Sequence, residues 1–202
     1  MVNWREELAA RGAARVPWGL APSRLAALQQ ATDSLLQPRD HRSPDFWCCP
    51  GPGGAQVLYR VHRFETHWPA VLTLLQAPEI VAVLDALYGA TARPTALALC
   101  LKEPHVGAAV PWHRDPIDVP AQTVFNLSLN LDDSTPDNGC LAFVPGSHQN
   151  NEPVCAPEPP GLEDLPVEAG GILAHDVCVI HGSRQNPTPT RRRALVVEFQ
   201  VR

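Results

Sequence analysis

Short segments rich in β-forming residues fill the carboxyl-terminal half of the chain, and this pattern restricts the fold more than any other feature. Turn residues separate these segments, which lie at 95–102, 124–131, 140–146, 170–181 and 193–202. A succession of short strands at this spacing is typical of a small barrel or jelly roll. We therefore predict a mainly β fold with helices packed on its outside.

The amino-terminal part carries the helical patterns. Residues 23–37 and 77–89 repeat apolar side chains at helical spacing, whereas residues 54–64 resemble an edge strand. A chain of 202 residues fits one domain. We divide that domain into a helical part of about 1–90 and a jelly-roll core of about 95–202.

Composition narrows the range of partners. The net charge is −5, and acidic and basic residues are interspersed, which argues against a surface for nucleic acid or anionic lipid. No apolar stretch approaches the length of a membrane span, and the first residues lack a secretory signal pattern. We therefore expect a cytoplasmic protein that binds neither nucleic acid nor a membrane. The six cysteines form no CxxC pair and indicate reduced thiols.

Two segments bear on whether the barrel encloses a ligand. Residues 149–168 hold five prolines and no periodicity, so we interpret them as a surface loop over a pocket. Residues 124–131 alternate apolar side chains with Asn126, Ser128 and Asn130. In an open sheet this polar face meets water, and in a barrel with a polar ligand it turns inward. The sequence leaves both arrangements open. If the polar face turns inward, Asn126 is a candidate cofactor-binding residue.

His113 and Asp115 lie two residues apart in the stretch PWHRDPIDVP. If the stretch is extended, both side chains leave the same face and form part of a metal site. The alternative is a surface His and Asp beside a turn proline. The third ligand is His175 or His181, which point the same way if their strand is unbroken. The flanking residues favour His181, because it ends an apolar run, whereas a histidine in mid-strand is more often packed.

Two imidazoles and one carboxylate on one face of an octahedron are typical of non-haem iron(II) oxygenases. The three open positions suit a bidentate acid and dioxygen, and the far end of the acid then needs a cation. Arg192 lies 11 residues after His181, and a guanidinium binds a carboxylate through two parallel hydrogen bonds. Arg191 and Arg193 alternate away from Arg192, so we expect both to face solvent.

Three pieces of the chain, LKEPHVGAAVPWHRD, LNLDDSTPDNGCLAFVPGSH and HGSRQNPTPTRRRALVV, follow one another in this order. With these motifs the chain resembles, over nearly its whole length, the phytanoyl-CoA dioxygenase superfamily of Fe(II)- and 2-oxoglutarate-dependent oxygenases. The resemblance implies a double-stranded β-helix, the cupin-like form of the jelly roll. It also implies Fe(II), the cosubstrate 2-oxoglutarate, O2, and succinate and CO2 as products.

The resemblance assigns roles to individual residues. It implies that His113, Asp115 and His181 hold the iron and that Arg192 and Ser183 bind 2-oxoglutarate. It also matches one family lysine near the pocket to Lys102, which could equally be a surface charge at a strand end. Relatives that halogenate lack the carboxylate, so its presence here favours hydroxylation or a related desaturation or ring closure.

Departures from the family pattern leave the substrate open. Arg114 stands where many relatives have glutamine, and Ser128 lies near a position where many have tryptophan. We expect a small metabolite or natural-product intermediate. Arg60, Arg63, Arg114 and Trp112 either line an entrance that favours an anion or lie at the surface. The alternatives to an oxygenase are a metal-binding, cupin-like isomerase or sensor module and a purely structural barrel.

Overall fold

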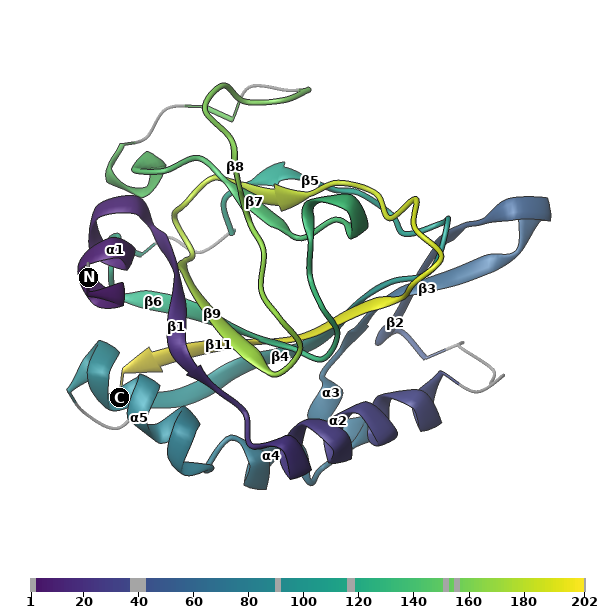
Figure 1. Cartoon of the computed structure of the whole chain (residues 1–202), viewed down its shortest axis with the longest axis horizontal. Helices are drawn as coiled ribbons and strands as arrows, with labels where there is room; N and C mark the ends of the chain where they lie inside the picture. The colour runs from purple at the N-terminus through teal and green to yellow at the C-terminus, as the bar shows by residue number, and fades with distance from the viewer. Residues whose placement is uncertain are drawn as a thin grey trace.

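The computed structural model describes residues 3–36, 43–89, 92–115, 119–150, 153–154 and 157–201, and Figure 1 shows its arrangement. The helices are α1 (Trp4–Arg11), α2 (Pro22–Leu35), α3 (Phe64–His67), α4 (Val71–Leu74) and α5 (Pro78–Tyr88), with short 3-10 helices at η1 (Pro52–Gly54), η2 (Pro136–Asn138) and η3 (Ser147–Gln149). The strands are β1 (Ala13–Gly19), β2 (Phe46–Pro50), β3 (Gln56–His62), β4 (Ala92–Lys102), β5 (Val110–His113), β6 (Val124–Asn130), β7 (Leu141–Phe143), β8 (Glu163–Leu165), β9 (Gly171–Asp176), β10 (His181–Ser183) and β11 (Arg192–Val201).

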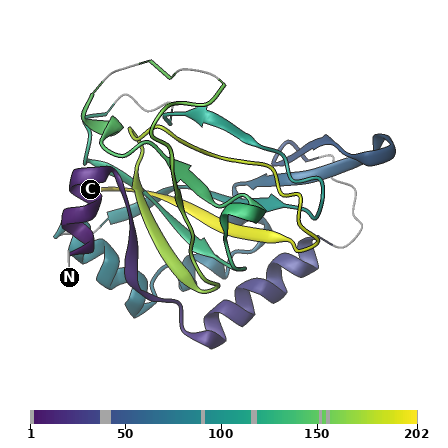
Figure 2. The same cartoon turned by 45° about the horizontal axis from the view of Figure 1, so that its top comes forward.

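Within the described residues the strands form two antiparallel sheets that face each other (Figure 2). The larger has the order β1-β9-β6-β11-β4-β3-β2, and the smaller has the order β5-β10-β7-β8. This arrangement is the mainly β jelly roll that the sequence predicts. The part expected to be helical, about 1–90, also contains β1, β2 and β3. β1 pairs with β9 and β3 pairs with β4, so the early strands satisfy backbone groups at the sheet edges.

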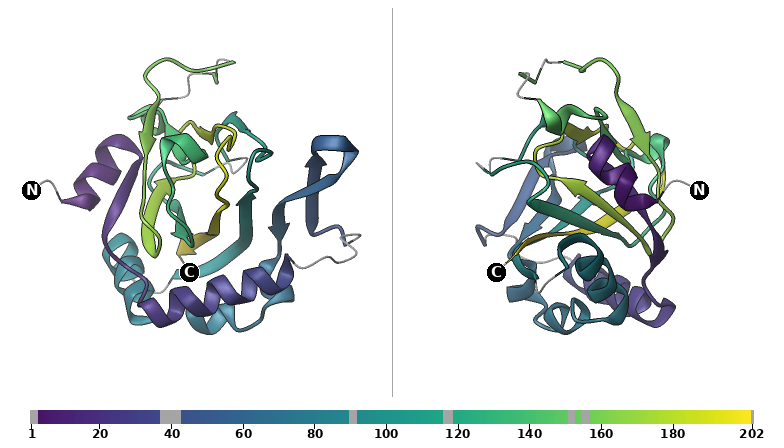
Figure 3. Two further views of the ribbon diagram at one scale, coloured as in Figure 1. Left: turned by 45° about the vertical axis from the view of Figure 1, so that its right-hand side comes forward. Right: turned by 90° about the vertical axis from the view of Figure 1, so that its left-hand side faces the viewer.

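The hydrophobic core lies between the larger sheet and the helices α2, α4 and α5, which run along one of its faces (Figure 3). Leu127 and Leu129 of β6, Leu195 and Val197 of β11, and Leu28 of α2 belong to this buried cluster. Because strand side chains alternate, the remaining positions of β6 and β11 face the space between the sheets. One face of the sheet therefore stabilises the fold and the other is available for a site.

The segment 170–181 is not one continuous strand. β9 ends at Asp176, whose carboxylate accepts a hydrogen bond from the backbone N–H of Cys178 at 2.8 Å, and β10 begins at His181 in the other sheet. His175 and His181 therefore approach the interior from opposite sheets. The loop expected at 149–168 contains β8 and lies partly outside the described residues.

None of the described helices combines the length and apolar character that a membrane span requires. The cysteines that the structure describes are free thiols, and Cys155 lies outside the described residues.

Candidate active site

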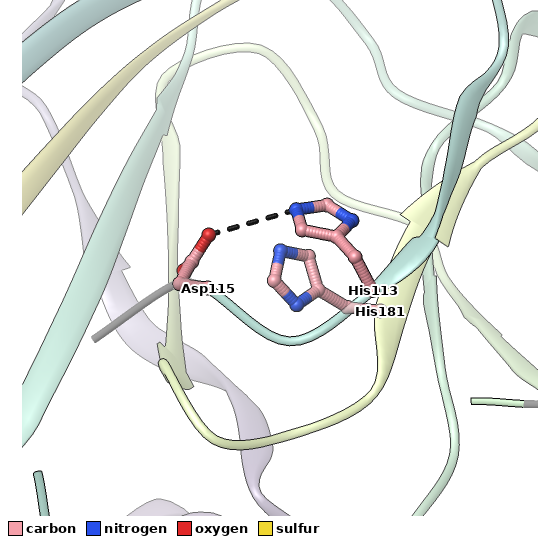
Figure 4. A group of neighbouring side chains, drawn as sticks. All are labelled: His113, Asp115 and His181. Atoms are coloured by element: carbon pink, nitrogen blue, oxygen red, sulfur yellow. Dashed lines mark ion pairs between the residues drawn. The ribbon is translucent and has the colours of Figure 1, made fainter. Parts of the chain in front are cut away.

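A cluster of three side chains lies between the two sheets (Figure 4). His113 ends β5 and is the cross-strand partner of His181, which begins β10. Asp115 follows β5 in a loop segment whose backbone N–H donates to the carbonyl of Val177 at 3.0 Å. One donor atom from each of the three residues lies within 4.8 Å of the others. The structure thus brings together the three residues that the sequence predicts as metal ligands.

Both imidazoles of the cluster are held by backbone carbonyl groups. His113 Nδ1 lies 2.7 Å from the carbonyl of Pro111, and His181 Nδ1 lies 3.0 Å from the carbonyl of Val179. A carbonyl can only accept, so each ring carries its proton on Nδ1 and leaves the lone pair of Nε2 free. His113 Nε2 lies 3.5 Å from Asp115 Oδ1. Metal-binding histidines typically adopt this orientation, in which Nδ1 donates to a carbonyl group and Nε2 faces the metal.

The electrostatics of the cluster suit a cation. Burial by itself raises the pKa of Asp115, but the hydrogen bond with His113 and the charges of the surrounding imidazoles hold that pKa well below its usual range. The same hydrogen bond raises the pKa of His113, whereas burial lowers the pKa of His181. The carboxylate is therefore ionised at neutral pH, and a divalent cation would bind at His113 Nε2 in place of the proton that a charged imidazole carries there.

His175 is not part of the three-residue cluster, although its ring centroid lies 4.5 Å from that of His181. Asn126 lies between His175 and the cluster. Its side-chain amide donates to Asp115 Oδ2 at 2.7 Å and contacts His175 Nε2 at 3.2 Å. Burial lowers the pKa of His175 to about 3, so the ring is a neutral acceptor for that amide. Asn126, predicted as a cofactor-binding residue, lines the cavity and donates to a candidate ligand.

The cluster opens into a cavity of about 340 Å³ between the sheets. Asn126 and Ser128 line this cavity, so the polar face of β6 points inward. β11 pairs with β6, and its residues on the same face also line the cavity: Arg192, Ala194, Val196 and Glu198. A wider depression of about 1110 Å³ beside β5 and β10 contains none of the three candidate ligands, so we place the active site in the smaller cavity.

Arg192 lies in the same cavity as the cluster and is buried. Its Nε donates to Ser134 Oγ at 3.0 Å, and no other hydrogen bond of this guanidinium is found among the described residues. Its cross-strand neighbour Lys102 is also buried, and Lys102 Nζ donates to the carbonyl of Ala108 at 2.6 Å. Lys102 is therefore not a surface charge. Ser183, at the end of β10, lines the cavity as well.

Arg193 does not face solvent, so that expectation is wrong. Only 7% of its surface is exposed. Its guanidinium donates to both carboxylate oxygens of Asp132, at 2.9 Å each, and to Asp33 at 2.6 Å. Alternation along the strand is preserved, but the face opposite Arg192 is covered by α2 instead of water. Arg191 is partly buried and forms a two-point ion pair with Glu103.

Of the four residues considered for an entrance, Arg60 lines the cavity. Arg63 pairs with Asp45 at 2.7 Å, Arg114 donates to the backbone carbonyls of Ser147 and Cys178, and the Arg184 guanidinium lies over the ring of Trp112. The sequence analysis did not single out His62 or Glu198, which also line the cavity. Side chains alternate between the two faces of a strand, so His62 shares a face with Arg60 and Glu198 shares a face with Arg192. This alternation could have identified both residues from the sequence.

A family model described as phytanoyl-CoA dioxygenase (PhyH) matches residues 8–194. The chain belongs to this family. It is 38% identical to AviO1 from Streptomyces viridochromogenes Tue57, whose crystal structure superimposes with a TM-score of 0.88 over 98% of this chain and 93% of that one. The structure of EvdO2 from Micromonospora carbonacea var. aurantiaca, complexed with 2-oxoglutarate, is 25% identical, with a TM-score of 0.78 and coverage of 100% and 92%.

A curated PhyH relative gives a more distant match. The mouse phytanoyl-CoA dioxygenase domain-containing protein 1 is 27% identical over 160 residues, which is 68% of this chain and 55% of that protein. The chain spans a little over half the length of the curated relatives it matches most strongly. A jelly-roll member of the PhyH family with a His-Asp-His cluster has the donor set that Fe(II) and 2-oxoglutarate require.

Proposed function

We propose that this protein is an Fe(II)- and 2-oxoglutarate-dependent dioxygenase. It hydroxylates, or otherwise oxidises, an unactivated C–H bond of a small metabolite or natural-product intermediate and releases succinate and CO2. The observation that carries the proposal is the placement of His113, Asp115 and His181 in one cavity with the buried guanidinium of Arg192. Asp115 supplies a carboxylate ligand, which favours hydroxylation over halogenation.

The residues present fit an Fe(II) ion. Two imidazoles present free Nε2 lone pairs beside one ionised carboxylate, and their Nδ1 protons are held by carbonyl groups. Such a site leaves open positions on the metal, where iron supplies activation of O2 for the oxidation. The protein contributes orientation, because Asn126 holds Asp115 Oδ2.

Arg192 is placed to bind the far carboxylate of 2-oxoglutarate. Ser134 holds Nε, so the guanidinium presents its two terminal nitrogens as a rigid fork. Lys102 adds a second basic group beside it, with no acidic partner in an ion pair among the described residues. Two buried basic groups at one end of a cavity favour an anionic ligand, since an unpaired buried charge is costly.

A spectroscopic titration tests the proposal. Under anaerobic conditions, Fe(II) and 2-oxoglutarate together should give a weak visible charge-transfer band. Asp115→Ala should abolish the band, and Arg192→Gln should require at least tenfold more 2-oxoglutarate to reach the same absorbance, because the charge-assisted hydrogen bonds are lost. Arg191→Gln is the matched control and should titrate like the unmodified protein.

The same titration separates the alternatives. If metal analysis confirms that iron is bound and no band forms at saturating 2-oxoglutarate, the protein is a metal-binding barrel that is not an oxidase. Succinate release against a panel of candidate small molecules then identifies the substrate of an active enzyme.

A further inference from the structure

Two polar side chains on β3 face the cavity, and each has one buried nitrogen atom without a hydrogen-bond partner among the described residues. Arg60 and His62 are alternate residues of one strand, so both leave the same face of the larger sheet, and both line the cavity of the cluster. The buried atoms Arg60 Nε and His62 Nε2 have no hydrogen-bond partner among the described residues. Six buried side-chain atoms of the described residues lack a partner, and three of them belong to Arg60, His62 and His175, which all line this cavity. Buried polar atoms are nearly always hydrogen-bonded in folded proteins, so their concentration in one cavity points to a missing ligand.

Register offsets Arg60 by two residues, and His62 by four, along β4 from the pair formed by Lys102 and Arg192. Arg60 pairs with Cys100 and His62 pairs with Ala98, whereas Lys102 pairs with Arg192. Arg60 and the three candidate ligands line one cavity, so Arg60 is on the same side of the larger sheet as the cluster.

Trp47 holds this pair of side chains in place. It is the cross-strand partner of Arg60, and its ring centroid lies 3.9 Å from that of His62. The Trp47 side chain is on the β2–β3 hairpin, which projects beyond the barrel (Figure 3), and 47% of its surface is exposed. The hairpin therefore forms a preorganised outer wall, with the imidazole held by a tilted contact with the Trp47 ring.

The charges in the cavity direct an anion to this wall. Glu198 of β11 also lines the cavity, and its carboxylate accepts a hydrogen bond from Thr95. Within the described residues Arg60 and Glu198 do not pair with each other. A negative group entering the cavity is repelled near Glu198 and attracted near Arg60, so β3 is the side on which it binds.

We propose that Arg60 and His62 form an anchor for an anionic oxygen group of the substrate, a carboxylate or a phosphate. The proposal rests on the proposed function, since it assigns the substrate side of the same site. A guanidinium binds either anion through two parallel hydrogen bonds, and a neutral imidazole whose proton is on Nε2 adds one more donor. The substrate is then an organic acid or phosphate ester whose oxidised C–H bond lies near its acidic group.

The test uses methylphosphonate as a probe and acetate as its competitor. The protein is loaded with Mn(II) and 2-oxoglutarate, and the metal-induced relaxation of the 31P nucleus reports binding of the probe near the cluster. Arg60→Gln should raise the dissociation constant of methylphosphonate at least tenfold, and Arg60→Lys should raise it less because the charge remains. His62→Gln should also weaken binding. Displacement by acetate indicates a carboxylate substrate, and tight binding that acetate does not reverse indicates a phosphate.

Controls separate this anchor from the cosubstrate site. Arg93→Gln, an exposed arginine outside the cavity, should bind the probe like the unmodified protein. The affinity for 2-oxoglutarate should stay within twofold in Arg60→Gln. Equal probe binding in Arg60→Gln, or an equal loss of 2-oxoglutarate affinity, overturns the anchor while leaving the oxygenase proposal intact. Absence of the Fe(II)–2-oxoglutarate band in the unmodified protein overturns the proposed function instead.

Discussion

Asn126 connects a candidate iron ligand to a fully buried histidine through one side-chain amide. The amide nitrogen donates to Asp115 Oδ2 and also contacts His175 Nε2. The carboxylate can only accept, so it fixes which way the amide points. Asp115 follows the end of β5, so its own strand does not hold the carboxylate in place. The contact with Asn126 is therefore what orients the second oxygen of this ligand.

We predict that Asn126→Ala weakens metal binding by about 10- to 100-fold, the range found when partners of metal ligands are removed. Competition between the protein and a chelating dye for Mn(II) measures the affinity. Asn130→Ala is the matched control, because Asn130 lies on the same face of β6 but donates to the carbonyls of Ser128 and Gly171. Equal affinities in the two variants would contradict the role of Asn126.

Residue spacing predicted which three side chains come together. It did not predict which other side chains surround them. The interval between His113 and Asp115, and the apolar run that ends at His181, both indicated the residues that the structure brings together. The environment of Arg60 could not be predicted, because it depends on β3 joining the larger sheet beside β4. Local sequence sets which side chains share a face, and the pairing of distant strands sets what that face meets.

The contact between α2 and β11 shows the same limit at the scale of elements. The alternation of the arginine run was correct for Arg192, which faces the cavity, but solvent was the wrong environment for Arg193. Arg193 joins the strand to the helix through Thr32 Oγ1, at 2.9 Å, and through Asp33. An isolated strand pattern does not reveal that a helix from 160 residues earlier covers its outer face.

We predict that Arg193→Ala lowers the free energy of unfolding by about 2–3 kcal/mol, because it leaves the partly buried Asp132 without its partner. Urea denaturation followed by circular dichroism measures the change. Arg93→Ala, an exposed arginine of β4, should change stability by less than about 0.5 kcal/mol. A loss below about 1 kcal/mol for Arg193→Ala would show that α2 is held by its apolar contacts alone.

The whole molecule keeps a basic interior at one end of the barrel despite a net charge of −5. Burial and the neighbouring charge of Arg192 lower the pKa of Lys102 to about 7. Lys102 therefore loses its positive charge as the pH rises through neutrality, whereas a lysine in the unfolded chain stays charged up to about pH 10. Attraction for an anion at this end of the barrel must weaken over the same range.

We predict that the dissociation constant of 2-oxoglutarate rises several-fold between pH 6 and pH 8.5 at constant ionic strength and saturating Mn(II). Deprotonation of Lys102 removes the positive charge next to Arg192, the residue that we assign to the dianion. Calorimetric titration across this range measures the trend, and Lys102→Met should show weaker binding that changes little with pH. A steep pH dependence that persists in Lys102→Met would assign the effect to another group.

Strands β6 and β11 direct neighbouring residues to opposite faces of one sheet. Leu127 and Leu129 pack against the helices, while Ser128 and Val196 face the cavity. Variation at the second kind of position can alter which molecules the enzyme accepts without loosening the scaffold. Substitutions at alternate residues of one strand can therefore change the substrate that such a fold accepts, while the residues between them keep the protein folded.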